Sequence, residues 1–285
     1  MSATGLPLKL DRMVEKPVNI ESDLSYASML AAIPTHLYRY HGVSSDRMEW
    51  IRRLLVHSEL YFTSSSTFND PLDCRISFDF NSSTLKIEQY WRKETKDYSL
   101  NAKARKKRIK ELIKESRTAV GEEKFNSRLF GALSNFGIVC ASDRADSTLM
   151  WSYYAESHQG IILRFNVSRE LTPAFRNAVV PIRVHYSQDF PRVKFYEAST
   201  EQKVFAMIGT KAEAWKHERE WRLVTRSHGY FRVPSTIVDG VILGLHTSAN
   251  HEYQIRKWVA ERKSPTELFR MRNRKDSFIL EPVPA

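Results

Sequence analysis

Glu218 and Glu220, two carboxylates with one residue between them, are the pair in this sequence best suited to acid–base chemistry. If 217–223 is a strand, alternation places both on one face together with Arg222. Two carboxylates held that close repel each other, which raises the pKa of one of them. Such a pair can act as a general base, or can hold a ribose hydroxyl while stabilising a cationic sugar. The same spacing also fits a solvated strand edge on which Glu and Arg pair.

A second group of polar side chains lies in the loop 68–73, which reads Phe-Asn-Asp-Pro-Leu-Asp. Asn and Asp before Pro favour a turn, because their side chains bond nearby backbone N–H groups. The loop is therefore either a rigid turn anchored by Phe68 or the polar mouth of a pocket. Asp70 and Asp73 also carry the oxygen ligands that metal ions bind. Cys74 and Cys140 sit among apolar neighbours, which is typical of inert buried thiols.

An aromatic stripe is expected on a helix over 147–157, where Trp151, Tyr154 and His158 recur at i, i+3 and i+7. Residues at these spacings share one helix face. Such a stripe usually packs into a core. Its functional alternative is a wall on which a nucleobase stacks.

The elements that must position these groups are strands scattered irregularly among helices. That order differs from the regular strand–helix alternation of a doubly wound sheet, so the sequence predicts an α+β fold with a mostly antiparallel sheet. Apolar and β-branched runs predict strands, and apolar residues at helical spacing predict helices. The expected strands are 36–40, 59–64, 137–142, 161–165, 182–186, 221–225, 238–243 and 277–281, and the expected helices are 25–33, 46–58, 147–157, 201–216 and 250–262.

Residues 84–134 depart from this pattern, because they are highly charged, helical in character and free of strand signals. Within them, 103–117 holds eight Lys or Arg and two Glu. We expect a basic helical insertion that attracts a polyanion, since phosphates seek clustered cations. The alternative is a solvated helix without a partner. The cations proposed to contact nucleic acid are Lys103, Arg105, Lys106, Lys107, Arg108 and Lys110.

Composition narrows the function classes. The chain has 285 residues and a formal net charge of +11, which favours an anionic partner. It holds no Gly-rich phosphate loop, HExxH or GxSxG motif, so classical dinucleotide dehydrogenases, ATPases, zinc proteases and serine hydrolases are not expected. Two cysteines and no long apolar run favour the cytoplasm and no membrane span. We expect a lead-in over 1–34 and a single α+β domain over 35–285.

Several stretches together resemble a bacterial family of unknown function, number 2971. The resemblance lies in the order and the amino-acid sequences of short motifs that cover most of 37–245. They are the segments 37–40 (LYRY), 60–64 (LYFTS), 68–73 (FNDPLD), 150–155 (MWSYYA) with His158 and Gly160, and 215–222 (WKHEREWR).

A more distant resemblance is to the ADP-ribosyltransferase fold, whose core is a split β-sheet. One class of these enzymes carries an Arg on its first strand, a Ser/Thr cluster on a second and a Glu-x-Glu on a later one. The order here is Arg39, then 63–65 (TSS), then 218–220 (ERE). The other class, with His, Tyr and Glu, is matched by His36, Tyr61 and Glu220.

This second resemblance implies an NAD-consuming enzyme, a toxin or phage-defence effector in which NAD is the substrate. Glu220 would stabilise the positive charge on the ribose, Glu218 would deprotonate the nucleophile and Ser64 would brace Glu220. We then expect Arg39, Ser64 and Glu220 to converge on one site. The residues implied to bind NAD are Arg39, which would hold a phosphate, and Tyr38, Tyr61, Phe68, Asn69 and Asp70.

Two other functions fit the same residues. A nucleic-acid-binding or metal-dependent nuclease module would use Asp70, Asp73 and Glu218, although no ligand spacing among them is diagnostic and no metal is expected. A non-catalytic interaction domain would use the charged helices to dock a partner. Release of nicotinamide from NAD separates the first function from these two.

Overall fold

The computed structural model describes residues 33–96, 98–167 and 178–285. The predicted helix over 25–33 and nearly all of the lead-in therefore lie outside the described residues. The described chain divides into two compact units. One, the sheet unit, contains the described residues of 33–64, 136–167, 178–186 and 213–285, and the other, the helical unit, contains those of 65–96, 98–135 and 187–212. The single domain expected over 35–285 stays a prediction.

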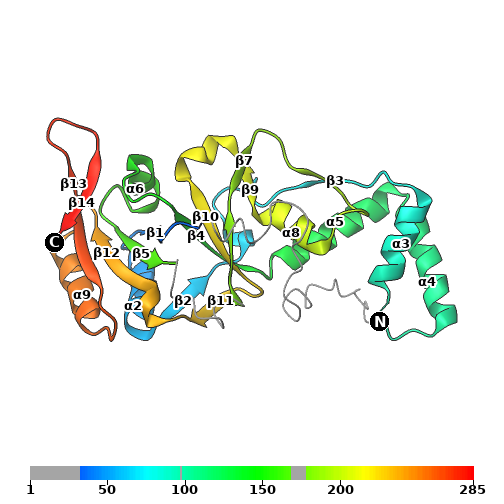
Figure 1. Cartoon of the computed structure of the whole chain (residues 1–285), viewed down its shortest axis with the longest axis horizontal. Coiled ribbons are helices and arrows are strands. Elements are labelled where there is room, and N and C mark those ends of the chain that lie inside the picture. Colours follow the sequence, from blue (N-terminus) through cyan, green and yellow to red (C-terminus); the bar gives the residue numbers. More distant parts are fainter. Residues whose placement is uncertain (1–32, 97, 168–177) are drawn as a thin grey trace. The chain divides into compact units, whose positions relative to one another are not determined.

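The sheet unit is built on an eight-stranded sheet with the order β14-β13-β12-β5-β1-β4-β10-β6 (Figure 1). Neighbouring strands are antiparallel, except that β12 and β13 run parallel across the crossover helix α9 (Ala249–Ala260). The expectation of an α+β fold with a mostly antiparallel sheet is confirmed. The strands are β1 (His36–His41), β4 (Gly137–Ser142), β5 (Ile161–Asn166), β6 (Val180–Arg183), β10 (Glu220–Thr225), β12 (Val238–Leu243), β13 (Glu267–Asn273) and β14 (Leu280–Pro284).

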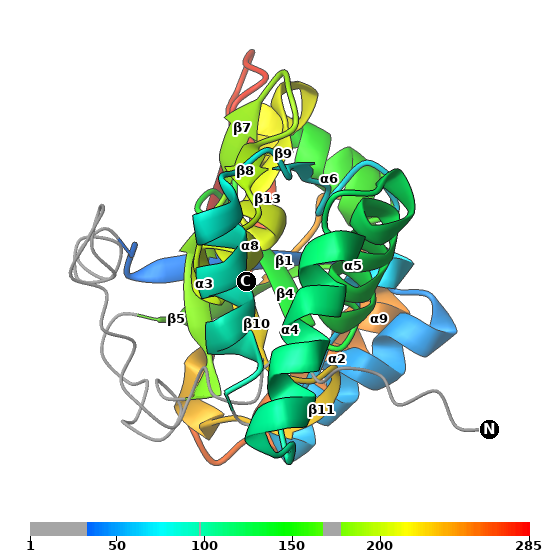
Figure 2. The same ribbon diagram turned by 90° about the vertical axis from the view of Figure 1, so that its right-hand side faces the viewer.

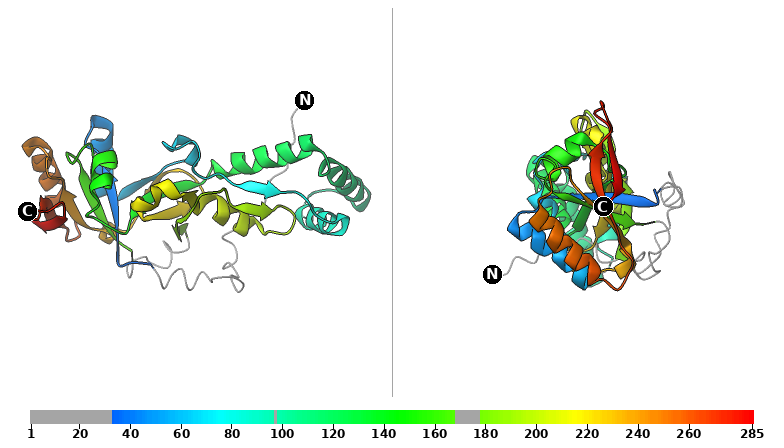
Figure 3. Two further views of the ribbon diagram at one scale, coloured as in Figure 1. Left: turned by 90° about the horizontal axis from the view of Figure 1, so that it is seen from above. Right: turned by 90° about the vertical axis from the view of Figure 1, so that its left-hand side faces the viewer.

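Strand alternation gives this sheet two differently covered faces. On one face, Leu37, Leu163 and Trp221 join a core with α2 (Ser45–His57) and α9, which pack side by side (Figure 3). On the other face, Tyr40 and Ile162 pack against Trp151 of α6 (Thr148–Tyr154). We call these the α2 face and the α6 face. Because successive side chains point to opposite faces, alternate residues of β1, β4 and β10 lie on the α2 face and on the α6 face. The face on which a residue lies decides which side chains it can contact.

Smaller elements complete the sheet unit. Strands β2 (Glu59–Phe62) and β11 (Gly229–Arg232) form an antiparallel pair, and a 3-10 turn, η3 (Glu213–Glu218), leads into β10. The remaining described elements here are β7 (His185–Ser187) and the 3-10 turn η4 (Ser235–Ile237). Among the described residues, no helix is long and apolar enough to cross a membrane.

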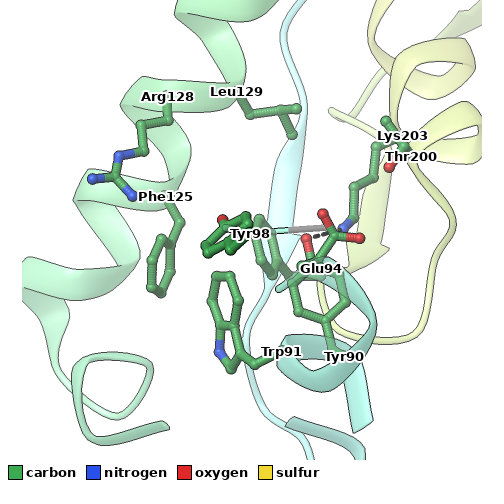
Figure 4. A pocket seen from close by; sticks show the side chains of 10 residues that line it. Tyr90, Trp91, Glu94, Tyr98, Phe125, Arg128, Leu129, Thr200 and Lys203 are labelled. Carbon is green, nitrogen blue, oxygen red and sulfur yellow. Dashed lines mark hydrogen bonds between the residues drawn. The ribbon is translucent and has the colours of Figure 1, made fainter. Parts of the chain in front are cut away.

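The helical unit contains α3 (Thr84–Glu94), α4 (Ala102–Glu115), α5 (Ala119–Leu133) and α8 (Thr200–Ile208) (Figure 2). Each begins at a Ser, Asn or Thr whose side chain accepts a backbone N–H, as N-caps do. Buried residues of α3, α4 and α5, among them Trp91, Leu112 and Phe125, form one cluster with Phe195 and Tyr196. Figure 4 shows two of them, Trp91 and Phe125, side by side. Helical structure expected over 84–134 is thereby confirmed. Short elements of this unit are η2 (Ser65–Thr67), β9 (Thr210–Ala212) and the parallel pair β3 (Ser77–Asp79) and β8 (Arg192–Lys194).

The strand expected over 221–225 is confirmed as β10, but the chain before it is not extended, because Arg219 adopts a left-handed conformation with φ 48°. Two other predictions about elements are wrong in part. The helix expected over 201–216 ends at Ile208, because Gly209, a poor helix former, takes the C-cap position. The strand expected over 277–281 begins at Leu280, and its partner β13 was not predicted.

Candidate active site

Glu218 and Glu220 lie where η3 passes into β10, the strand between β4 and the edge strand β6. The side chains are 3% and 4% exposed, so both carboxylates are almost withdrawn from water. The left-handed Arg219 turns the chain between them. Their proximity therefore comes from a turn that precedes the strand, and the alternation expected along 217–223 does not apply to Glu218.

Glu220 and Arg222 form a buried two-point ion pair on the α6 face. Arg222 Nε donates to Glu220 Oε1 at 2.8 Å and Nη2 donates to Oε2 at 3.2 Å, and Arg222 is 0% exposed. A planar guanidinium fork matches a carboxylate in this way and fixes its orientation. The alternative of a solvated strand edge is excluded for these two residues, because neither meets water.

Hydrogen bonds fix the backbone and side chain around Glu218 as well. Tyr154 of α6 donates its hydroxyl to Glu218 Oε1 at 2.6 Å, and Ser142 Oγ donates to the Glu218 carbonyl oxygen at 2.6 Å. Tyr186 accepts the backbone N–H of Glu220 at 2.8 Å. Tyr154 is thus a polar partner of Glu218, and Arg222 is a polar partner of Glu220.

An aromatic rim stands beside Glu218 and was not among the predicted site residues. Tyr153 of α6 is 65% exposed, and its ring centroid lies 6.5 Å from that of His217. Trp215 is partly exposed and lies 6.1 Å from His217. Three rings beside a buried carboxylate pair offer a flat ligand a stacking surface. The signal in the sequence was the aromatic spacing of Trp215 and His217 directly before the Glu pair.

Arg39 is not brought to Glu220. It lies opposite Leu163 on the neighbouring strand, which places it on the α2 face, whereas Glu220 lies opposite Ser142 on the α6 face. Arg39 Nε donates to His41 Nε2 at 3.0 Å, and Nη1 donates to the Cys140 carbonyl oxygen at 3.3 Å. The expected convergence of Arg39 with Ser64 and Glu220 is wrong for Arg39. Successive side chains of a strand point to opposite faces, and the side chain of Arg39 points to the face opposite that of Glu220.

The other predicted NAD contacts are distributed between the faces and the units. Tyr38 lies opposite Ser142 and therefore on the same face as Glu220. Tyr61 stacks on Trp50 of α2, with centroids 5.7 Å apart. His36, the alternative first residue, pairs with Asp239 at 2.8 Å. Ser64 is buried in the sheet unit, while Phe68, Asn69 and Asp70 belong to the helical unit.

The loop 68–73 forms the turn expected of its sequence. Asp70 Oδ1 accepts the backbone N–H of Leu72 at 2.8 Å, and Asp73 lies 3.7 Å from the buried ammonium of Lys211. A cation of the protein thus faces Asp73, which weakens the metal interpretation. Among the described residues, no group of three His, Cys, Asp or Glu could hold a metal ion.

The residues of the stripe, Trp151, Tyr154 and His158, have different environments. Trp151 is fully buried, packs its edge on Tyr40 and donates to the Ala145 carbonyl oxygen at 2.8 Å, so the core interpretation is confirmed for it. Beyond α6, Glu156, Ser157 and His158 are consecutively left-handed, with φ of 46°, 53° and 68°. Such strain persists only where surrounding contacts enforce it. A Cβ at Gly244 would clash with the His158 carbonyl oxygen, so glycine is required there.

Two histidines make stability depend on pH. Burial, with Arg39 and Arg47, lowers the pKa of His41 well below 6.5, and burial, with His246, lowers the pKa of His158. The unfolded chain binds these protons first as the pH falls, so stability is lost below the unfolded pKa. We expect the free energy of unfolding to fall below about pH 6.5 by up to about 1.4 kcal/mol per pH unit from the buried His41, and by less from His158, which solvent screens.

Denaturant unfolding across about pH 7.5 to about pH 5.5 measures this slope. His41→Gln keeps an acceptor for Arg39 and should flatten it, whereas the exposed His228→Gln should not. Equal slopes for both variants would contradict the assignment to His41.

Comparison with known proteins finds one match, to a family model that covers part of the chain. No curated protein and no solved structure matches the chain. The strained turn after α6, the Glu218–Glu220 pair and Arg222 all fall within one matched stretch. Residues 150–223 match the model of the family described as a protein of unknown function (DUF2971), which confirms the family resemblance that the sequence predicted.

Proposed function

We propose that the chain is an NAD-consuming enzyme of the ADP-ribosyltransferase type, with its active site at Glu218 and Glu220. The observation that carries this proposal is the buried carboxylate pair at the start of β10, with Tyr154 hydrogen-bonded to Glu218 and Arg222 paired with Glu220. Paired carboxylates in different environments suit a reaction that needs one charge stabiliser and one base. Tyr38, Ser142 and the aromatic rim belong to the same unit.

The chemistry assigns each carboxylate a separate task. The bond between ribose C1′ and nicotinamide nitrogen breaks, its electron pair leaves with nicotinamide, and positive charge develops on the sugar. Glu220, held in place by Arg222, stabilises that charge. Water or an acceptor hydroxyl bonds to C1′ and passes its proton to Glu218, which Tyr154 orients.

Other residues would bind the substrate. The rim of Tyr153, Trp215 and His217 offers a stacking surface for nicotinamide. Arg39 has no part in this revised site, because it points to the α2 face. The resemblance to the ADP-ribosyltransferase fold thus supports the proposal through the Glu pair and not through its phosphate-binding Arg.

Incubation of the purified chain with NAD tests the proposal. We expect free nicotinamide to accumulate, with ADP-ribose appearing either free in water or attached to an added target. Target arms should include single-stranded RNA, single-stranded DNA and protein. Absence of nicotinamide release in every arm would reject the proposal.

A basic surface in the helical unit favours nucleic acid as the target. In α4, Ile109 and Leu112 are buried, while Lys103, Lys106, Lys107 and Lys110 are exposed. The two predicted arginines serve the fold in part, since Arg105 Nη2 donates to the Arg92 carbonyl oxygen at 2.7 Å and Arg108 Nη1 to Glu111 at 3.2 Å. The four exposed lysines are the cations positioned to meet phosphates. We call them the α4 lysines.

Charge reversal tests this surface. If about four cations meet phosphates, log affinity should fall with log salt at a slope of about −3 to −4. Changing Lys106, Lys107 and Lys110 to Glu should weaken binding steeply at about 50 mM salt and flatten that slope. The matched control changes the exposed Lys257, Lys263 and Lys275 of the sheet unit to Glu. Equal losses in both triple variants would show that net charge alone attracts the strand.

A further inference from the structure

A strained residue separates the two carboxylates of the candidate active site. Arg219 has φ 48°, in the left-handed region that residues with a Cβ rarely adopt. Glycine, and after it asparagine, occupies such positions at the least cost. The conformation turns the chain from η3, which ends at Glu218, into β10, which begins at Glu220. The relative placement of the two carboxylates therefore depends on a φ angle that arginine does not favour by itself.

The side chain of Arg219 is held by Asp143, the residue that follows β4. Arg219 Nη2 donates to Asp143 Oδ2 at 3.0 Å, and Arg219 Nε lies 2.6 Å from Asp143 Oδ1. The Asp143 side chain is 13% exposed and the Arg219 side chain 50%, so the carboxylate is the anchored member of the pair. A two-point contact fixes the direction of a guanidinium more closely than a single hydrogen bond does.

Backbone contacts join the same two segments. The Asp143 N–H donates to the Arg219 carbonyl oxygen at 3.3 Å, and Ser142 Oγ donates to the Glu218 carbonyl oxygen at 2.6 Å. Ser142 also lies opposite Glu220 in the ladder between β4 and β10. The end of β4 thus meets each of the residues 218, 219 and 220. A strained conformation persists only where such surrounding contacts enforce it.

We propose that Asp143 is a positioning residue of the candidate active site, which holds the left-handed turn at Arg219 and so sets the geometry of Glu218 and Glu220. The inference rests on the proposed function, because it concerns the alignment of these carboxylates with bound NAD. Small displacements of reacting groups cost large factors in rate. Asp143 therefore acts on kcat through the turn, and not through contact with the substrate.

A phosphate-binding role is the alternative for Arg219, since half of its side chain is exposed. The pair with Asp143 disfavours that role, because the carboxylate offsets the positive charge that would attract a phosphate. The two roles also make different demands on position 219. Positioning requires a residue that tolerates a positive φ, whereas phosphate binding requires the guanidinium.

Nicotinamide release by three variants at position 219 separates these roles. Arg219→Gly, Arg219→Asn and Arg219→Val all remove the guanidinium, but glycine and asparagine accept the left-handed conformation and the β-branched valine does not. We expect Arg219→Gly and Arg219→Asn to keep most of their turnover. Arg219→Val should lose about 10- to 100-fold in kcat, with little change in KM for NAD.

Variants of Asp143 test its part in the turn. Asp143→Ala should lower kcat by a similar factor, and adding Arg219→Gly should restore part of that loss, because glycine holds a positive φ without help. Asp146→Ala is the matched control, since Asp146 makes a two-point pair with Arg144 on the same loop, at 2.8 and 2.6 Å, and should leave kcat unchanged. Chemical denaturation shows which variants are folded. If Asp143→Ala is not, Asp143→Asn, which keeps an acceptor for Arg219, takes its place with a smaller expected loss.

Three outcomes would overturn the inference. Unchanged kcat in a folded Asp143→Ala would leave the Asp143–Arg219 pair a surface contact. Equal losses in all three variants at position 219, with KM raised, would make Arg219 a substrate contact. A loss in Asp143→Ala that Arg219→Gly does not relieve would show that Asp143 acts by another route. Absence of nicotinamide release by the unchanged chain would reject the proposed function together with this role, whereas release that Asp143→Ala does not alter rejects this role alone.

Discussion

Replacing Arg222 by methionine lowers the free energy of unfolding by about 3–5 kcal/mol, the usual cost of removing one partner from a buried ion pair. The arginine is 0% exposed and holds both oxygens of Glu220. Methionine has a similar reach, so little packing is lost, but Glu220 keeps its charge in a site almost without water. Chemical denaturation at about pH 7.5 measures the change.

Two further variants identify the cause of that loss. Arg222→Met combined with Glu220→Leu should recover much of the stability, because the two charges that bond each other are then removed together. Arg92→Met removes an exposed i,i+4 pair with Glu88 and should cost within about 0.5 kcal/mol. If Arg222→Met costs no more than Arg92→Met, the Glu220–Arg222 pair contributes nothing that distinguishes it from a surface pair.

The sequence predicted well those strands whose side chains are buried on both faces of the sheet, and those in which buried and exposed side chains alternate. Strand β4 was expected and found over 137–142, and β12 over 238–243. Both are apolar runs bounded by turn residues. The helix over 201–216 was predicted too long, because Gly209 inside that range takes the C-cap position and ends α8 at Ile208.

The candidate site was predictable as a motif but not as a geometry. The Glu-x-Glu-x-Arg spacing identified Glu218, Glu220 and Arg222, and all three are buried. Whether Arg39 joins them depends on the register of β1 against β5, a long-range pairing that one sequence does not reveal. A shift of one residue would have turned Arg39 to the α6 face. The turn at Arg219 likewise depends on a positive φ, which is uncommon for arginine and could not be predicted from the residue type.

Glu220→Gln should reduce nicotinamide release about 10²–10³-fold, the usual effect of removing one electrostatic stabiliser of a transition state. Glutamine keeps the shape of the side chain and one acceptor for Arg222, but it removes the negative charge that the cationic sugar needs. The loss should fall mainly on kcat, because the charge acts on the transition state more than on bound NAD. Assays run well below the unfolding temperature of the variant separate catalysis from the stability cost of weakening the contact with Arg222.

Two matched variants show whether the loss of turnover is specific to Glu220. Glu213→Gln makes the same chemical change on the exposed first residue of η3, where the carboxylate pairs with Lys216, and should leave turnover within about twofold of the unchanged chain. Glu218→Gln should also slow turnover, but nucleophiles that need no proton removed should recover part of the rate, because Glu218 acts as the base. Equal turnover in Glu220→Gln and Glu213→Gln, with both proteins folded, would leave Glu220 a structural partner of Arg222 and remove the charge stabiliser from the mechanism.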